Sequence, residues 1–378
     1  MKILYLTGQI KYQGGIEKVL SMKMNALAEH FGHDVYLITY EQGGKDFVYP
    51  ISSKVHYYDF QLNYDVAIHK KGLFAPRNII KGIKHLFLLK KALKEINPDV
   101  VILPNGGYDF FYLPFIAKHI PKIREIHSSL YQRAFKAEGL KQRIMNVVDI
   151  FFEKRYTSIV VLNEDEKSFV HNKHVGVIPN PIELSYSQKL QVVKQQKVIA
   201  AGRLCWVKGY DNLIKAWTIV HERIPQLELD IYGGGESDYV TYLKQCIKEC
   251  NLQKVVHLKG SVPDLKQVLP EYSLFVCSSH TECFPMVLLE AMSCGVPVVS
   301  YDCPSGPRNI ISDKEDGFLV ADQDINALAE RIIFYFSSAS DKQQMQTAAC
   351  NKTKTFEINH VMNLWLNWIN QNIQWNIQ

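Results

Sequence analysis

Two glutamates enclose an apolar run in the segment ECFPMVLLE, residues 282–290. Pro285 favours the first turn of a helix, where the backbone N–H groups of residues 283–287 can hold a phosphate. Glu282 precedes that helix and is predicted to accept hydrogen bonds from sugar hydroxyls, while Glu290 is predicted to take the two hydroxyls of a ribose. The alternative is an acidic residue near a helix start and an ordinary helical glutamate. The apolar neighbours of Glu290 count against that alternative.

Two cations follow another expected strand, in GRLCWVKG. Arg203 offers a planar fork of donors and Lys208 a compact charge, a combination that suits a diphosphate. The alternative is a pair of solvated surface charges. The position of the loop at a strand end, between Gly202 and Gly209, favours the diphosphate.

Glycines follow two more expected strands and allow close approach of a ligand to the backbone. Gly14 and Gly15 end the loop GQIKYQGG before a helix, which indicates phosphate or sugar contact, although GxGxxG is not completed. Gly234 is the middle residue of a Gly-Gly-Gly run, for which ligand contact and a tight turn are equally supported.

Two further motifs have less specific chemistry. His127 ends the expected strand KIREIH and is a candidate acid, base or hydrogen-bond donor, although single histidines are more often structural. Asp322 and Asp324 form a DxD pattern that some transferases use for a metal. Because a helical segment follows, we interpret Asp324 as a helix N-cap and predict no metal site.

Strands and helices alternate along the chain, which positions these residues after strands. Apolar strands are expected at residues 2–8, 34–40, 99–105, 122–127, 158–163 and 175–180, and again at 197–204, 227–235, 255–262, 274–279, 296–301 and 316–320. Helical periodicity fills the intervals. The sequence therefore predicts an α/β fold of two doubly wound domains, with ligands bound in a cleft beyond the carboxyl ends of parallel strands.

The length of 378 residues supports this division. We predict an N-terminal domain over residues 1–184, a C-terminal domain over 185–355 beginning with a polar linker (185–197), and a terminal helix, 356–378, that packs back on the N-terminal domain. The composition is globular, with 47% hydrophobic and 21% charged residues. The eight cysteines form no paired CxxC pattern, and no apolar run suits a signal peptide or membrane span, so a cytoplasmic protein with reduced thiols is expected.

Charge is distributed unevenly. Residues up to Leu184 carry 25 basic and 18 acidic side chains, a net +7, and the remainder carries 18 and 20, a net −2. The basic half suggests an anionic partner, and the absence of a nucleic-acid-binding signature favours a membrane surface or a phosphate-bearing acceptor. The basic amphipathic segment 76–96 could dock on an anionic membrane, although an ordinary domain helix with snorkelling lysines is the preferred interpretation.

The motifs together resemble the retaining glycosyltransferases of family 4, which have the GT-B fold of two Rossmann-like domains. ECFPMVLLE resembles the E-x7-E motif of that family, GRLCWVKG its G-R-(x)n-K-G segment, and GGIEKVL its N-terminal glycine loop. They occur in the order and spacing of the family over essentially the whole chain. YDCPSGPRNII is similar to members that build bacterial surface polysaccharides. Pro285 departs from the pattern, because many members have glycine there, and this leaves the donor sugar open.

The resemblance implies a role for each matching residue. Arg203 and Lys208 would hold the donor diphosphate, Glu282 the sugar, Glu290 the ribose, and His127 would approach the donor sugar and stabilise the transition state. The remaining implied donor-binding residues are Gly14, Gly15, Gly202, Gly234, Val262 (at the base), Phe284, Pro285, Met286 and Val287.

The predicted activity is transfer of a sugar from a nucleotide diphosphate donor, with UDP as the expected nucleotide, to a hydroxyl of a glycan or a lipid-pyrophosphate-linked acceptor, without a metal or another cofactor. The protein could then work at the inner membrane face. Two alternatives share the architecture: a UDP-sugar 2-epimerase, and a protein that binds nucleotide sugars without turning them over.

Overall fold

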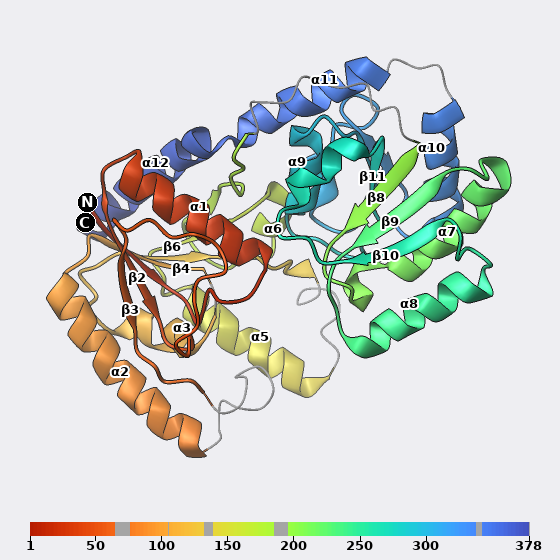
Figure 1. Cartoon of the computed structure of the whole chain (residues 1–378). Helices are drawn as coiled ribbons and strands as arrows, with labels where there is room; N and C mark the ends of the chain where they lie inside the picture. The colour runs from red at the N-terminus through yellow and green to blue at the C-terminus, as the bar shows by residue number, and fades with distance from the viewer. Residues whose placement is uncertain (65–75, 105, 132–138, 185–195, 338–341, 378) are drawn as a thin grey trace. The chain divides into compact units, whose positions relative to one another are not determined.

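The computed structural model contains two parallel sheets, each within its own compact unit (Figure 1). It describes residues 1–64, 76–104, 106–131, 139–184, 196–337 and 342–377. The first unit comprises residues 1–181 and 358–378, and the second comprises residues 182–357. The predicted start of the C-terminal domain at 185, and most of the linker, lie outside the described residues.

The first unit has a seven-stranded sheet with the order β3-β2-β1-β4-β5-β6-β7, in which every neighbouring pair is parallel. Its strands are β1 (Lys2–Leu6), β2 (Asp34–Thr39), β3 (His56–Asp59), β4 (Val100–Leu103), β5 (Lys122–Glu125), β6 (Ser158–Val161) and β7 (Val175–Val177). Its helices are α1 (Gly15–Glu29), α2 (Pro76–Ile96), α3 (Tyr108–Tyr112), α5 (Leu140–Glu153), α6 (Glu164–Lys167) and α12 (Ile358–Ile377).

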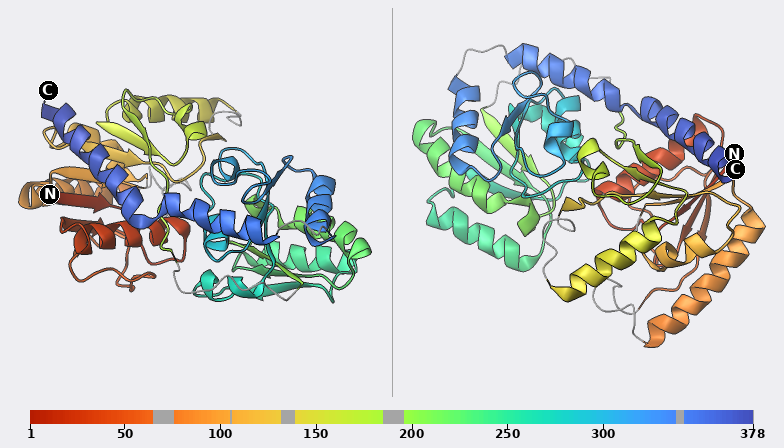
Figure 2. Two further views of the ribbon diagram at one scale, coloured as in Figure 1. Left: turned by 90° about the horizontal axis from the view of Figure 1, so that it is seen from above. Right: turned by 180° about the vertical axis from the view of Figure 1, so that it is seen from behind.

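Helices cover both faces of this sheet (Figure 2). On one side α2, α3 and α5 contribute to a single apolar cluster with the sheet, and on the other α12 packs along α1. Two tryptophans of α12 contact β6 and the residues at the start of β7. Trp368 donates from Nε1 to Ser158 Oγ at 3.1 Å and lies directly over Gly176, and the ring of Trp375 stacks on His174 with centroids 4.1 Å apart.

The second unit has a six-stranded parallel sheet with the order β10-β9-β8-β11-β12-β13. The strands are β8 (Lys197–Ala201), β9 (Glu228–Tyr232), β10 (Val256–Gly260), β11 (Leu274–Cys277), β12 (Val298–Tyr301) and β13 (Phe318–Val320). The helices are α7 (Tyr210–Arg223), α8 (Ser237–Glu249), α9 (Met286–Ser293), α10 (Ile325–Ser337) and α11 (Lys342–Thr353).

The predicted class of two doubly wound α/β domains is confirmed. β8 and β11 are buried throughout except at Lys197, as expected for strands covered on both faces. The strand order of the second sheet reverses between these two strands, and ligands of doubly wound sheets bind beyond the carboxyl ends of strands at that point. All eight cysteines are free thiols. Within the described ranges, no helix combines the length and the apolar character needed to cross a bilayer.

Candidate functional site

The loop after β8 carries both predicted cations. Arg203 is exposed, and Lys208 ends a single 3-10 turn, Trp206–Lys208. Gly209 then adopts a left-handed conformation with φ of +59°, and a Cβ at this position would collide with the carbonyl oxygen of Ser278. Glycine is therefore required for the loop to pack against the end of β11 and lead into α7.

Lys208 and Glu282 meet where β8 and β11 end. Lys208 Nζ lies 2.5 Å from Glu282 Oε1, and the same oxygen accepts a hydrogen bond of 2.6 Å from Ser279 Oγ. Ser278 Oγ donates to the Lys208 carbonyl at 2.9 Å, which fastens one loop to the other. A small pocket opens among these groups, and Ala201, Lys208, Tyr210, Ser279, Glu282 and Val287 are part of its lining.

The charge of Lys208 is maintained by its surroundings. Burial lowers the pKa of Lys208, but Glu282 outweighs this effect and leaves the pKa above its ordinary value. The neighbouring Cys277 thiol has a raised pKa because it is buried and because Glu282 is close. Lys208 therefore stays charged and the Cys277 thiol stays neutral, so Lys208 can pair with an anionic ligand that replaces Glu282 as its partner.

α9 follows Glu282 and begins one residue later than predicted, at Met286. Pro285 is its N-cap, with φ of −72° and ψ of 94°, rather than its first helical residue. The N–H groups of Met286 and Val287 lie in the first turn, where a helix offers them no internal acceptor. Two anion-binding elements, Lys208 and this helix start, therefore lie on the loops that follow β8 and β11.

The other residues of the ECFPMVLLE segment are largely enclosed. Glu290 lies inside α9 and is 6% exposed. The ring of Phe284 is buried and packs edge-on against Phe356, with centroids 5.7 Å apart, so this ring is part of the core of the second unit. Gly306 approaches closely, since a Cβ there would lie 2.6 Å from Glu282 Cβ. The YDCPSGP segment thus supports Glu282 directly, a contact that its sequence did not indicate.

The Gly-Gly-Gly run at the end of β9 pairs with the Arg203 loop. Leu204 N donates to the Gly234 carbonyl at 2.8 Å, and a Cβ on Gly235 would collide with the Leu204 carbonyl oxygen. A packing reason therefore exists for these glycines independent of any ligand. Gly202 has φ of +151° and bonds to β9, while Val262 lies in the loop after β10, half-buried.

The predicted residues of the first unit lie beyond β1 and β5. Gly14 is the N-cap of α1, and Gly15 is its first residue, with open space around its Cα. His127 follows β5, and 2% of its side chain is exposed. Its Nε2 lies 3.1 Å from Glu125 Oε1, and Glu125 is a residue that the sequence did not single out.

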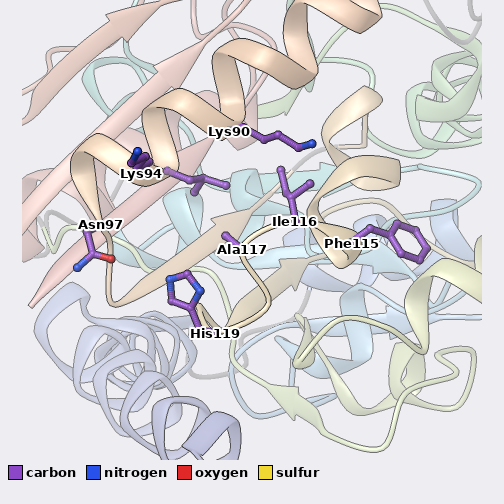
Figure 3. Close-up of a pocket in the computed structure, with 8 residues that line it drawn as sticks. Lys90, Lys94, Asn97, Phe115, Ile116, Ala117 and His119 are labelled. Atoms are coloured by element: carbon purple, nitrogen blue, oxygen red, sulfur yellow. The ribbon is translucent and has the colours of Figure 1, made fainter.

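Two other features do not take part in this site. Asp324 Oδ1 accepts from the Ala327 N–H at 2.9 Å and caps α10, as predicted from the sequence. A pocket of about 430 Å³ lies in the first unit where α2 ends, lined by Lys90, Leu93, Lys94, Asn97, Phe115, Ile116, Ala117 and His119 (Figure 3). None of the predicted donor-binding residues lines it.

Comparison with known families matches both halves of the chain. The model described as Glycosyltransferase Family 4 matches residues 13–186, and the model described as Glycosyl transferases group 1 matches residues 183–352. An uncharacterized glycosyltransferase of Haemophilus influenzae is 26% identical over 96% of this chain and 98% of its own length. A Campylobacter jejuni relative, named as an α-1,4-N-acetyl-D-galactosaminyltransferase acting on a diNAcBac-PP-undecaprenol-linked glycan, is 26% identical over 98% of both chains.

Other relatives are longer, and the chain spans 40% of the poly(glycerol-phosphate) alpha-glucosyltransferase of Bacillus subtilis, at 25% identity. Solved structures share the fold over nearly the whole chain. Sucrose-phosphate synthase of Thermosynechococcus elongatus has a TM-score of 0.80 at 18% identity, covering 98% of both chains. Anabaena HepE, solved with UDP and glucose, has a TM-score of 0.73 at 20% identity and covers 98% of this chain and 99% of its own. The chain is therefore a glycosyltransferase of the GT-B fold, built from a Glycosyltransferase Family 4 domain and a Glycosyl transferases group 1 domain.

Proposed function

We propose that this glycosyltransferase moves a sugar from a UDP donor to a hydroxyl of a glycan or lipid-linked acceptor, with retention of anomeric configuration, in polysaccharide biosynthesis. The observation that carries the donor assignment is the Lys208–Glu282 pair beside the start of α9. A cation and free helix N–H groups suit a diphosphate, and a carboxylate beside them suits sugar hydroxyls. Relatives support the substrates: HepE was solved with UDP-glucose, and the C. jejuni relative is named for an undecaprenol-linked acceptor.

The chemistry needs charge stabilisation at the leaving group. The bond from the anomeric carbon to the diphosphate breaks, and a bond to the acceptor oxygen forms on the same face. The acceptor proton passes to the departing phosphate oxygen. Arg203, Lys208 and the α9 N–H groups stabilise the charge that develops on the diphosphate, so we propose that no metal is required. His127 acts at the donor sugar in this proposal, and Glu290 binds the ribose.

In this proposal Lys208 and Glu282 exchange partners when the donor binds. The donor phosphate draws Lys208 away from Glu282 Oε1, and the released carboxylate oxygen accepts a sugar hydroxyl. Because Ser279 also donates to that oxygen, Glu282 stays oriented during the exchange. The ion pair between Lys208 and Glu282 is thereby replaced by two contacts with the donor, one from Lys208 to the phosphate and one from Glu282 to a sugar hydroxyl.

A membrane surface is the second part of the proposal. On α2 one row of exposed residues begins with Ile80, Ile83 and Phe87 and continues with Lys90 and Lys94. Spacings of three and four residues place the row on one side of the helix. A helix that combines exposed apolar side chains with lysines matches the interface of an anionic bilayer.

α5 repeats this arrangement on the same side of the first sheet (Figure 2). Its exposed row consists of Ile144, Val147 and Phe151, followed by Lys154. Large apolar side chains exposed on two helices of one unit exceed what an ordinary solvated surface requires. Peripheral association at an anionic membrane therefore accounts for both rows and for the basic first half of the chain.

The donor proposal is tested by measuring UDP release from UDP-glucose, UDP-galactose, UDP-GlcNAc and UDP-GalNAc, with and without a panel of glycan acceptors. Lys208→Ala and Glu282→Ala should lower turnover at least 100-fold, the usual size of losing a transition-state contact. Lys197→Ala is the matched control, because Lys197 pairs with Glu228 at the opposite end of β8.

The outcomes separate the alternatives. NMR of the product gives the anomeric configuration, and an inverted product would exclude retention. Activity that persists in EDTA supports metal independence, whereas strict manganese dependence excludes it. An epimer formed from donor alone would identify an epimerase, and binding without turnover would identify a binding protein.

A further inference from the structure

We propose that Glu125 and Lys23 are positioning residues that fix the imidazole of His127, with Trp365 of α12 enclosing them. The orientation of His127 is argued from the structure alone. Only the role of His127 at the donor sugar rests on the proposed function. The arrangement joins four elements of the first unit: α1, β5, the residues after β5, and the terminal helix. Lys23 and Trp365 are far from Glu125 and His127 in the sequence, so only the fold brings these residues together.

The carboxylate of Glu125 lies at the centre of this cluster. Lys23 Nζ donates to Glu125 Oε1 at 2.6 Å and to Oε2 at 2.7 Å, and His127 Nε2 lies 3.1 Å from Oε1. The side chains of all three residues are at most 2% exposed. Because side chains alternate along a strand, Glu125 and His127 lie on the same face of the sheet.

The lone pair of a deprotonated Nε2 would face an ionised carboxylate oxygen at 3.1 Å, so this contact favours the tautomer of His127 that carries its proton on Nε2. Burial raises the pKa of Glu125, but Lys23 and His127 outweigh it and bring the pKa to about 2, which keeps the group ionised. That tautomer leaves Nδ1 as the acceptor atom of the ring. Both ring nitrogens are buried, and within the described part of the chain neither forms a hydrogen bond of good geometry, so the contact of Nε2 with Glu125 is electrostatic.

Lys23 controls the charge that His127 experiences. Its ammonium neutralises Glu125 and lies 3.6 Å from the ring centroid of Trp365, which excludes water from that side. The other titratable group that packs against the cluster is Tyr5, whose pKa is raised well above 10 by burial and then by Glu125, so it stays neutral. Without Lys23, a buried carboxylate would face the imidazole alone and favour its protonated form.

Stability alone does not explain the cluster. Burial lowers the pKa of Lys23, and Glu125 offsets this only in part, so the lysine charge is held at an energetic disadvantage. Buried ion pairs are often replaceable by apolar residues without loss of stability. A buried charge pair retained beside a candidate catalytic imidazole is better explained by the orientation and charge that it imposes on that ring.

The opposite face of β5 provides a matched control. Arg124 donates from Nη1 to the buried Glu153 Oε1 at 3.0 Å, and its guanidinium lies 4.3 Å from the Phe110 ring centroid. This pair has the same composition of cation, carboxylate and aromatic ring, and Arg124 points to the opposite face of β5 from Glu125. Glu153→Gln therefore reports what the loss of a buried charge pair does without the imidazole.

The experiment uses the full chain with ¹⁵N-labelled histidine and follows the ring of His127 by NMR, assigned with His127→Ala. Wild type should show the proton on Nε2. Glu125→Gln should give a mixture of tautomers, because a side-chain amide can donate as well as accept. Lys23→Met should change the ¹⁵N chemical shifts of both ring nitrogens at neutral pH, because the ring then faces a carboxylate whose charge is not neutralised. Glu153→Gln should leave both properties unchanged.

A second assay links the imidazole of His127 to function. It measures turnover by each variant of the UDP-sugar from which wild type releases UDP fastest. Glu125→Gln should lower kcat about tenfold or more with little change in donor KM, and should shift the pH profile. An unchanged tautomer in Glu125→Gln, or equal changes in Glu153→Gln, would overturn the inference. Full activity of His127→Ala would instead refute the proposed role of His127 and leave the NMR result standing. Circular dichroism of each variant verifies folding. If Lys23→Met does not fold, Lys23→Arg is measured, and because it retains the charge it should keep the wild-type tautomer of His127.

Discussion

Lys208 Nζ lies 2.5 Å from Glu282 Oε1, although the two residues belong to loops that follow different strands. Each loop follows one of the two central strands at which the order of the second sheet reverses. In the proposed donor site, a nucleotide sugar competes with this internal pair for both charges.

This competition predicts opposite effects of one substitution on two ligands. Glu282→Gln releases Lys208, so free UDP should bind severalfold more tightly, because the diphosphate no longer displaces a carboxylate. Turnover of the UDP-sugar should nevertheless fall, because the amide replaces a charged acceptor for sugar hydroxyls. Isothermal titration with UDP and a UDP-release assay measure the two effects. Weaker UDP binding by Glu282→Gln would contradict the exchange of partners.

Gly209→Ala should destabilise the second unit. Its φ of +59° costs a residue with a Cβ about 1–2 kcal/mol, and the collision with the Ser278 carbonyl adds to this. Thermal unfolding should shift downward by several degrees, and UDP should bind more weakly because Lys208 is displaced. Gly106→Ala is the control, since a Cβ at Gly106 meets nothing within 4 Å. Equal stability of the two variants would exclude this account.

Acid should weaken the first unit through Glu125. Its pKa is about 2 in the folded chain, against an ordinary value of 4.5, so its contribution is complete above pH 4.5 and is lost as the pH falls toward 2. The full difference corresponds to about 3 kcal/mol. Urea unfolding between pH 5 and 3 should show a steeper loss of stability in wild type than in Glu125→Gln. Parallel curves for the two proteins would show that Glu125 does not carry this dependence.

Trp365→Phe should also destabilise the first unit. The smaller ring leaves space above Lys23 and weakens a buried cation–π contact, which together cost about 1–3 kcal/mol. Trp375→Phe is the control, because Trp375 is only half-buried and stacks on His174 away from Lys23. Chemical denaturation should separate the two variants, and a loss no larger for Trp365 than for Trp375 would argue against a special role of the Lys23 contact.

Membrane binding should depend on the exposed row of α2. Simultaneous replacement of Ile80, Ile83 and Phe87 by serine should reduce sedimentation with vesicles of phosphatidylcholine and 30% phosphatidylglycerol at least severalfold. Leu364→Ser is the control, because Leu364 is exposed on α12, on the other side of the first sheet. High salt should weaken wild-type binding, since lysines contribute roughly 1 kcal/mol each near an anionic surface. Equal sedimentation of wild type with anionic and neutral vesicles would exclude the membrane proposal.

The sequence was sufficient for the fold class, because apolar strands and helical periodicity alternate through both halves. It also identified the loops that carry Lys208 and Glu282, since each follows a strand. It did not indicate that these two side chains pair, because contact between loops depends on the order of strands in the sheet. The sequence predicts that they bind separate groups of a ligand, whereas in the structure they bind each other.

Other contacts were hidden for the same reason. Lys23 looked like one position of an amphipathic helix, and Glu125 like one charged residue in a short strand, yet they form a buried pair. The Gly-Gly-Gly run was equally compatible with a ligand and a turn, whereas the structure pairs it with the loop at Leu204. The start of α9 differed by one residue, because proline at the N-cap and proline in the first turn produce similar sequence signals.

The return of α12 to the first unit has a consequence for protein synthesis. Residues 1–181 leave the ribosome long before Ile358–Ile377, so the first unit cannot cover Lys23 or Gly176 until α12 has been made. The second unit is contiguous over residues 182–357 and can complete its core earlier. A nascent chain should therefore stabilise the second unit first, and a premature stop codon before Trp365 would impair the first unit, which is synthesised earlier.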